Sequence, residues 1–415
     1  MFFRGSGSCW TVAARLCLVC CALVLAPPAF AASLTGIGDL SGGAFHSQAW
    51  GISADGSTVV GRATTEFGSQ AVRWDAVNGL QGLGHLDGGG TTGRATAVSS
   101  DGSVIVGASD SMGSVASTSE FGTEAFRWDA ASGMQGLGDL LGGPFASVAR
   151  DVSADGAVVV GFSSATDLPG DSGTEAFRWE ASTGLVGLGA LPGGSIGTLA
   201  TGISADASII VGAAGRPDGE NTVGFRWDAV NGYRDLGDRP DGELDYNARA
   251  ISADGSVIAG RGFLPGIRWD EANGIRFLGP TDELGGIPNA VSDDGRMIGG
   301  DNSPFGAFIW TAETGVQGLD VFLAAMGVDV TGWTFDSVQG FSSDGRTIVG
   351  FGTNPSGNWE GFVAVVPEPS TATLLCLGLT ALGAMRRDSS ATRMCAIDAS
   401  RQEVQFRPPA SNSHS

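Results

Sequence analysis

Short apolar segments alternate with turn residues along this chain, and the alternation itself repeats. In each repeat, a turn of the Ser-x-Asp-Gly type lies between aliphatic residues, and an aromatic-Arg-Trp segment and a Gly-Leu-Gly segment follow it. Repeats of about 50 residues built from short strands are typical of propeller blades and of solenoid rungs. The pattern therefore predicts one all-β repeat domain. The turn aspartates are Asp55, Asp101, Asp155, Asp206, Asp254, Asp294 and Asp344.

The second repeat shows how four strands follow one another. Residues 95–99 and 103–107 flank Asp101-Gly102, a pair typical of a hairpin with a type I′ turn. Residues 124–129 and 134–140 then predict a third and a fourth strand. Four sequential antiparallel strands form a propeller blade. The small first strand of each repeat suits the crowded position beside a central channel.

The two ends of the repeat region predict how the domain closes. The seventh repeat reaches its third strand at 361–366, but no fourth strand follows. The segment 34–43 matches the fourth-strand pattern of 134–143. An N-terminal strand that completes the last blade would cover two exposed sheet edges. We therefore expect a closed seven-bladed β-propeller over residues 32–366, with an open β-solenoid as the alternative.

The N-terminus has the features of an export signal. Arg4 and Arg15 precede an apolar run over 16–25. Ala29-Phe30-Ala31 then forms a small-x-small cleavage site. This order predicts a secretory signal peptide over residues 1–31. A lipid-attachment cysteine at Cys20 or Cys21 is a weaker alternative. The repeat region itself contains no cysteine, so the fold has no disulfide on which to depend.

The C-terminal region carries a second sorting pattern. Pro367-Glu368-Pro369 is followed by an uncharged stretch over 371–385 and then by Arg386-Arg387. This order resembles the PEP-CTERM signal of Gram-negative bacteria that make exopolysaccharide. The resemblance implies a short hydrophobic transmembrane helix within 367–387, recognition by an exosortase-type processing protease, and delivery to the cell surface. The 28-residue tail 388–415 departs from the usual pattern, and its polar composition predicts disorder.

The phrase Glu-Ala-Phe-Arg-Trp occurs at 124–128 and again at 175–179, with variants in other repeats. Together with the Ser-x-Asp-Gly hairpin, it resembles the bacterial extracellular HAF repeat family, and the resemblance covers nearly all of the repeat region. It implies a secreted or surface protein, and it implies no particular activity. We also expect the Arg of this phrase, for example Arg127, to form an inter-blade ion pair with a turn aspartate.

Charge and histidine content narrow the function. Asp and Glu number 44 against 23 basic residues, a formal net charge of −21, which argues against binding to nucleic acid. The only histidines are His46, His85 and His414, so we expect no catalytic triad, no histidine metal site and no enzymatic activity. No cofactor is indicated, although acidic loops are suited to calcium.

The loops that join the second to the third strand, and one blade to the next, vary in length and share one face of a propeller. Variable loops on a rigid scaffold are the usual place for recognition. We therefore expect a non-catalytic binding or structural module of the extracellular polysaccharide matrix. A glycosidase or lyase that uses loop carboxylates is the alternative. The residues proposed for this face are Asp110, Glu120, Asp167, Asp171, Asp218, Glu220, Trp333 and Trp359.

Overall fold

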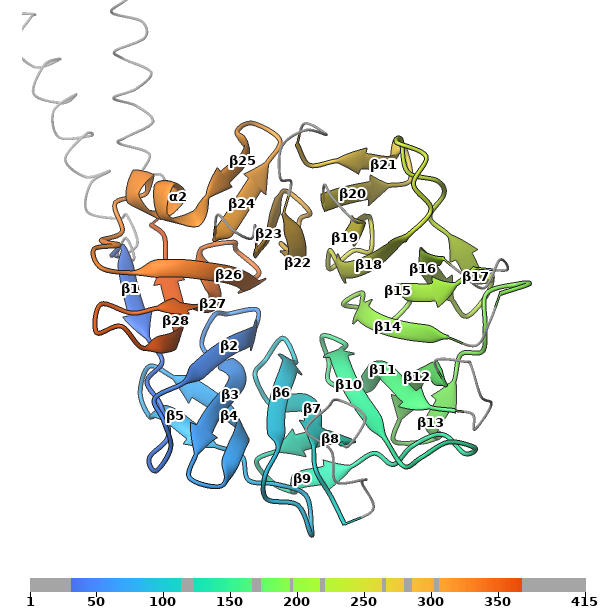
Figure 1. Ribbon diagram of the computed structural model, residues 1–415, viewed down its shortest axis with the longest axis horizontal. Helices are drawn as coiled ribbons and strands as arrows, with labels where there is room; N and C mark the ends of the chain where they lie inside the picture. Colours follow the sequence, from blue (N-terminus) through green and yellow to red (C-terminus); the bar gives the residue numbers. More distant parts are fainter. Residues whose placement is uncertain are drawn as a thin grey trace, which may run out of the picture. The chain divides into compact units, whose positions relative to one another are not determined.

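Seven four-stranded antiparallel sheets are arranged in a ring around a central channel (Figure 1). The computed structural model describes residues 31–112, 123–165, 173–194, 197–216, 221–262, 266–279, 286–301 and 306–367. Contacts group the chain from Ala31 to Val366 into one compact unit. The prediction of a seven-bladed β-propeller is confirmed, and the solenoid alternative is wrong.

In six blades the strands follow chain order from the channel outward, and in the seventh the N-terminal strand takes the outermost place. The first three blades are β2 (Ser47–Ile52), β3 (Val59–Thr65), β4 (Gly68–Asp75), β5 (Gly79–Gly82); β6 (Gly93–Val98), β7 (Val104–Ser109), β8 (Glu124–Asp129), β9 (Gly133–Gly136); and β10 (Ser147–Val152), β11 (Val158–Ser164), β12 (Thr174–Glu180), β13 (Gly184–Gly187). The next three are β14 (Thr198–Ile203), β15 (Ile210–Gly215), β16 (Thr222–Asp228), β17 (Gly232–Asp235); β18 (Tyr246–Ile251), β19 (Val257–Gly262), β20 (Gly266–Asp270), β21 (Gly274–Phe277); and β22 (Ile287–Val291), β23 (Met297–Asp301), β24 (Ala307–Thr311), β25 (Gly315–Gly318). The seventh is β26 (Thr334–Phe341), β27 (Thr347–Thr353), β28 (Trp359–Val365) and β1 (Ser33–Gly36).

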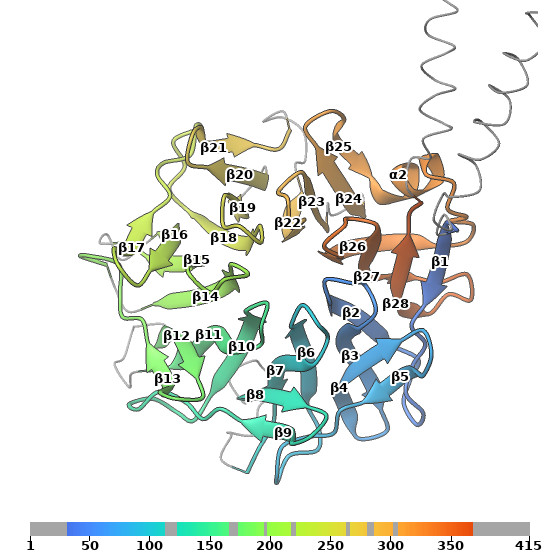
Figure 2. The ribbon, with the colours of Figure 1, turned by 180° about the vertical axis from the view of Figure 1, so that it is seen from behind.

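The N-terminal strand closes the ring as the sequence predicts. Strand β1 pairs antiparallel with β28, with Leu34 opposite Ala364, and both views show the two strands side by side (Figures 1 and 2). The buried Glu360 supports the junction because its Oε1 accepts a hydrogen bond from the backbone N–H of Gly38 at 2.8 Å. The two ends of the domain are therefore held by backbone pairing and by one buried carboxylate.

The Ser-x-Asp-Gly turns are built by side-chain hydrogen bonds. In the first blade, the Ser53 hydroxyl donates to Asp55 Oδ1 at 2.7 Å, and the same oxygen accepts the N–H of Ser57 at 2.9 Å. Gly56 has φ +74°, whereas Asp55 is not among the residues with positive φ. The predicted type I′ geometry is therefore wrong, because that turn requires positive φ at both central residues. The aspartate oxygen stabilises a turn in which only the last residue is left-handed.

These turns also join neighbouring blades around the channel. The N–H of Ala54 donates to the carbonyl of Ser100 at 3.0 Å, and the N–H of Ser100 donates to the carbonyl of Ala154 at 3.0 Å. The series continues from Ala154 through Ala205 and Ala253 to Asp293, and Ser343 donates back to Ala54. The second residue of each turn is thus part of an inter-blade network of backbone hydrogen bonds.

The third strands supply much of the packing between sheets. Phe126 is fully buried, and Trp128, which lies on the same face of β8, packs partly buried against the same cluster. The Arg between them does not form the predicted inter-blade pair with a turn aspartate. Arg127 instead contacts Asp129 of its own strand at 2.6 Å, because the side chains of residues i and i+2 lie on one face of a strand. Arg73 likewise contacts Asp75.

One helix interrupts the otherwise all-β part of the domain that the structure describes. Helix α2 (Leu319–Ala325) follows β25 and buries Leu319, Phe322 and Leu323. This helix has no counterpart among the strands that the repeat predicts. Within the described ranges, no helix is long and apolar enough to span a membrane. The hydrophobic segment expected at 371–385 lies outside those ranges.

Candidate binding site in the central channel

Each innermost strand carries a β-bulge that places one residue toward the channel. In β2, for example, the pairing with β3 shifts between Ala49 and Gly51, so that Trp50 has no opposite partner. A bulge re-aims a side chain without ending the sheet. We call the seven residues at this position the bulge ring: Trp50, Thr96, Arg150, Thr201, Arg249, Asn289 and Gln339.

The sequence contains a signal for this ring, although the ring is not among the predicted site residues. In five blades the preceding residue is a fully buried alanine: Ala49, Ala95, Ala149, Ala200 and Ala248. The second residue after the ring position is Ile, Val or Phe, and a Ser follows. The flanking positions are uniform because they pack between sheets, whereas the ring position differs between adjacent blades. A variable residue inside a uniform strand motif indicates a side chain that is not part of the core.

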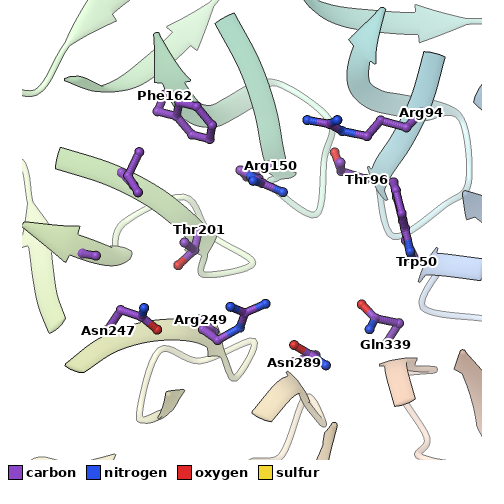
Figure 3. Close-up of a pocket in the computed structure, with 12 residues that line it drawn as sticks. Trp50, Arg94, Thr96, Arg150, Phe162, Thr201, Asn247, Arg249, Asn289 and Gln339 are labelled. Carbon is purple, nitrogen blue, oxygen red and sulfur yellow. The ribbon is translucent and has the colours of Figure 1, made fainter. Parts of the chain in front are cut away.

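A pocket of about 360 Å³ lies at the channel mouth formed by the starts of the inner strands. That side also carries the variable connections between the second and third strands. The bulge ring forms the floor of the pocket, and Arg94, Asn247 and Phe162 contribute to its wall (Figure 3). Its twelve lining residues include three arginines and two aromatic residues, and none of the twelve is Asp or Glu.

The aromatic rings of the pocket are each paired with a guanidinium group. The Cζ of Arg62 lies 5.2 Å from the ring centroid of Trp50, and the Cζ of Arg150 lies 5.3 Å from that of Phe162. These are distances at which a cation interacts favourably with an aromatic face. Arg62 is held further by a hydrogen bond from its Nε to Gln48 Oε1 at 2.7 Å. The pairs fix the orientation of both rings in the pocket.

The neutral members of the ring are also held in place. Thr96 Oγ1 lies 2.9 Å from the carbonyl oxygen of Ala149 in the next blade. The amide nitrogen of Asn289 donates to Asp301 Oδ2 at 3.0 Å, and that of Gln339 donates to Ser337 Oγ at 2.8 Å. Side chains that are positioned before a ligand arrives lose little conformational entropy on binding. The pocket is therefore largely preformed.

On the other side of the ring, toward the Asp-Gly turns, one carboxylate, that of Asp151, is found among the described lining residues. Asp151 contributes to a second hollow of about 200 Å³, where Gly or Ala stands in the other six blades. Its two oxygens accept hydrogen bonds from the N–H groups of Val152 and Ile203 at 2.8 and 2.9 Å. Burial raises the pKa of Asp151 to about 6. Since glycoside hydrolysis uses two carboxyl groups, the residues that line the two hollows supply no such pair.

The described members of the predicted ligand face have structural partners. Asp110 accepts hydrogen bonds from the N–H groups of Gly90 and Thr91 at 3.0 and 2.9 Å, and it thereby holds the connection before β6. Trp333 stacks on Phe335 with the centroids 6.1 Å apart, and Trp359 stacks on His46 at 6.0 Å. None of these three residues lines the channel pocket.

The remaining predicted residues lie outside the described ranges. On the ligand face these are Glu120, Asp167, Asp171, Asp218 and Glu220. In the sorting segments they are Ala29, Glu368, Pro369, Arg386 and Arg387, whereas Ala31 and Pro367 are the first and last described residues. Among residues that the structure describes, no group of three or more His, Cys, Asp or Glu is placed to hold a metal ion.

Comparison with known proteins supports the fold and goes no further. No family model matches the chain, and no curated protein matches its sequence. Among solved structures, the chain is similar to an oligogalacturonate lyase from Vibrio parahaemolyticus, with a TM-score of 0.51 and 11% identity over 82% of this chain and 98% of that one. TolB from Acinetobacter baumannii is similar with a TM-score of 0.41 and 14% identity over 75% of this chain and 81% of that one. At such low identity the likeness to the lyase shows a shared propeller fold alone.

Proposed function

We propose that the protein is a secreted or surface-anchored, non-catalytic binding module of the extracellular polysaccharide matrix, and that the channel pocket is its binding site. The observation that carries the proposal is the bulge ring. One residue from every blade is turned out of strand pairing and into a single preformed pocket. Concave sites with aromatic walls and a few fixed polar groups are typical of small-molecule recognition.

The pocket chemistry suits a sugar. Trp50 and Phe162 offer apolar ring faces, and the side chains of Asn247, Asn289 and Gln339 offer amide donors and acceptors. A sugar ring has apolar C–H faces and hydroxyl groups at its edge, so it complements such a mixture. The pocket volume lies at the lower end of the range for small-ligand sites, which runs from about 300 to 1,000 Å³. It therefore suits a short stretch of a glycan.

Export and anchoring rest on the sequence features at the two ends. The signal-peptide pattern ending at Ala31 and the Pro-Glu-Pro pattern beginning at Pro367 support delivery to the surface of a Gram-negative cell, with an exosortase-type protease as the processing partner. The resemblance to HAF repeats supports the same location. Mass spectrometry of the protein recovered from culture medium would test both cleavages, and an intact precursor confined to the cells would contradict them.

The binding proposal can be tested by affinity electrophoresis. The full chain is run through gels that contain exopolysaccharide from the producing organism, together with Trp50→Ala and Phe67→Ala variants. Phe67 is a suitable control because it is a 71% exposed aromatic residue that does not line the pocket. We expect retardation of the wild type and the control and its loss in Trp50→Ala. Equal mobility of all three proteins with and without polysaccharide would refute the proposal.

Catalysis is tested on the same material. Incubation of the polysaccharide with the protein should release no new reducing ends and no unsaturated sugar. Release of either product, abolished by a change at one loop carboxylate such as Asp167, would instead establish the carbohydrate-active alternative.

A further inference from the structure

We propose that the channel pocket recognises the acetamido group of a neutral N-acetylated amino sugar. The group is bound by Asn247 and by an apolar wall, which we define as Phe162, Leu199 and Ala213. The inference rests on the proposed function and specifies its ligand. It follows from a buried amide oxygen that has no hydrogen-bond donor, and from the apolar side chains beside it.

Three side-chain amides line the pocket, and Asn247 differs from the other two. The amide nitrogens of Asn289 and Gln339 donate to Asp301 Oδ2 and Ser337 Oγ. The Oδ1 of Asn247 is buried, and it has no hydrogen-bond partner among the residues that the structure describes. Buried polar groups are nearly always hydrogen-bonded, and one without a partner costs free energy. A ligand that donates to this oxygen removes that cost.

Asn247 is placed so that a ligand can reach it. It lines the pocket on the same side as Thr201 (Figure 3). The last torsion of an asparagine side chain has a broad energy profile. A small rotation therefore turns Oδ1 from its buried position toward the cavity.

The lining next to Asn247 is apolar. Leu199 takes in β14 the position that Asn247 takes in β18, and Ala213 lies opposite Leu199 on β15. Leu199 also packs against the small cluster that contains Phe162 of β11. These strands belong to three consecutive blades. The apolar wall and the amide of Asn247 therefore form one continuous sector of the pocket.

An acetamido group complements this sector. Its N–H donates to Asn247 Oδ1, and its methyl group contacts Leu199 and Ala213. A hydroxyl group in the same place would also donate, but it carries two lone pairs that the apolar wall cannot satisfy. An amide N–H has no lone pair that needs a donor. The sector therefore favours an acetamido group over a hydroxyl group.

The sugar ring extends from this sector across the pocket. Trp50 lies on the opposite side from Thr201 and Asn247 (Figure 3). The apolar C–H face of a pyranose can pack against its indole ring, while the acetamido group points to the apolar wall. One sugar residue thus contacts both sides of the channel.

The recognised group needs no charge. Arg94, Arg150 and Arg249 line the pocket, and each has an interaction of its own within the protein. A ligand anion is therefore not required to balance them. The formal charge of −21 repels anionic polymers at long range, whereas a neutral sugar is not repelled.

The test compares two trisaccharides that differ in one substituent. The full wild-type chain is titrated by calorimetry with triacetylchitotriose and with cellotriose, which share one skeleton and carry an acetamido or a hydroxyl group at carbon 2. We expect triacetylchitotriose to bind about tenfold more tightly, because it adds one hydrogen bond and one buried methyl group. Free N-acetylglucosamine should compete, whereas rhamnose, which has a methyl group but no N–H, should not.

Variants then locate the site on the protein. Asn247→Ala removes the acceptor, and Ala213→Leu fills the place of the methyl group. Each should weaken binding of triacetylchitotriose about fivefold or more. Asn231→Ala is the matched control, because Asn231 is an exposed amide that bonds to Asp228 in the turn before β17 and does not line the pocket. Melting temperatures verify that each variant is folded.

The outcomes separate the two levels of the argument. Equal affinity for the two trisaccharides, with binding lost in Trp50→Ala, would overturn the acetamido assignment and leave the proposed function intact. Binding of the producer's own polysaccharide without binding of triacetylchitotriose would do the same. A preference that folded Asn247→Ala retains in full would also overturn the assignment. Absence of binding to any glycan, including the producer's own polysaccharide, would overturn the proposed function itself.

Discussion

The turn glycine of the third blade offers a quantitative test of how the blades fit together. Gly156 has φ +71°, and a Cβ atom added there would lie 2.6 Å from Cγ2 of Val104 in the preceding blade. The left-handed conformation costs a non-glycine residue about 1–2 kcal/mol. Overpacking against Val104 costs about 1–3 kcal/mol. Alanine has less conformational freedom than glycine in the unfolded chain, and this difference raises the free energy of unfolding by about 0.4–1 kcal/mol.

Taking the middle of each range, Gly156→Ala should lower the free energy of unfolding by about 3 kcal/mol. The fourth blade provides the matched control because it naturally carries Ala207 at this position, with φ 60° and the same turn hydrogen bonds. Ala207→Gly relieves the left-handed strain but loses a half-buried methyl group and gains unfolded-state freedom. Its effect should therefore stay within about 1 kcal/mol.

Urea unfolding followed by tryptophan fluorescence measures both variants, and thermal melting gives an independent value. A loss of about 3 kcal/mol corresponds to a fall in Tm of roughly 4 °C for a domain of this size. A change below about 0.5 kcal/mol in Gly156→Ala would refute the reasoning, because it would mean that neither the positive φ nor the contact with Val104 constrains the turn.

Three further predictions concern charged groups. Burial raises the pKa of Asp151 to about 6, so the native protein retains a proton that the unfolded chain releases between about pH 4 and 6, and stability should fall by up to about 3 kcal/mol as the pH rises through that range. Asp151→Ala should abolish this contribution. Urea unfolding of the wild type and the variant at pH 4 and pH 7 measures it, and an equal change in the free energy of unfolding between the two pH values in both proteins would contradict the prediction. Glu360→Ala should cost about 1–3 kcal/mol and reduce hydrogen-exchange protection in β1, because the N–H of Gly38 and the amide of Asn354 lose their acceptor; unchanged protection would show that the carboxylate does not hold the closure. Arg127→Ala should change stability by less than about 1 kcal/mol because its pair with Asp129 is partly exposed, and a larger fall in Tm would revive an inter-blade role.

Particular residues show why some features could be predicted and others could not. The match between segments 34–43 and 134–143 predicted the closing strand, because one packing environment recurs in every blade. The turn type was mispredicted because the Asp55 carboxylate holds a backbone conformation that the Asp-Gly pair does not specify. Helix α2 was missed although Leu319, Phe322 and Leu323 have the i, i+3, i+4 spacing of a helix face, because the resemblance to strand-forming repeats covers nearly all of this region.

The position of the bulge ring could not be predicted from the repeat pattern. Nothing in a single repeat shows that Trp50 and Arg249 face one channel, since they are about 200 residues apart in a chain whose local pattern is the same at both places. Only closure of the ring brings them to one pocket. The residues could have been selected as variable positions after a uniform alanine, but their convergence could not.

The amino-acid sequence alone determined the blade, the number of blades and the closing strand, because local turn chemistry and the alternation of apolar residues recur with each repeat. The tertiary structure decided the register shifts of the inner strands, the partners of the repeated arginines and the pocket. Those features depend on contacts between blades, where the side chains that meet come from distant parts of the chain and are placed by the curvature of the whole ring.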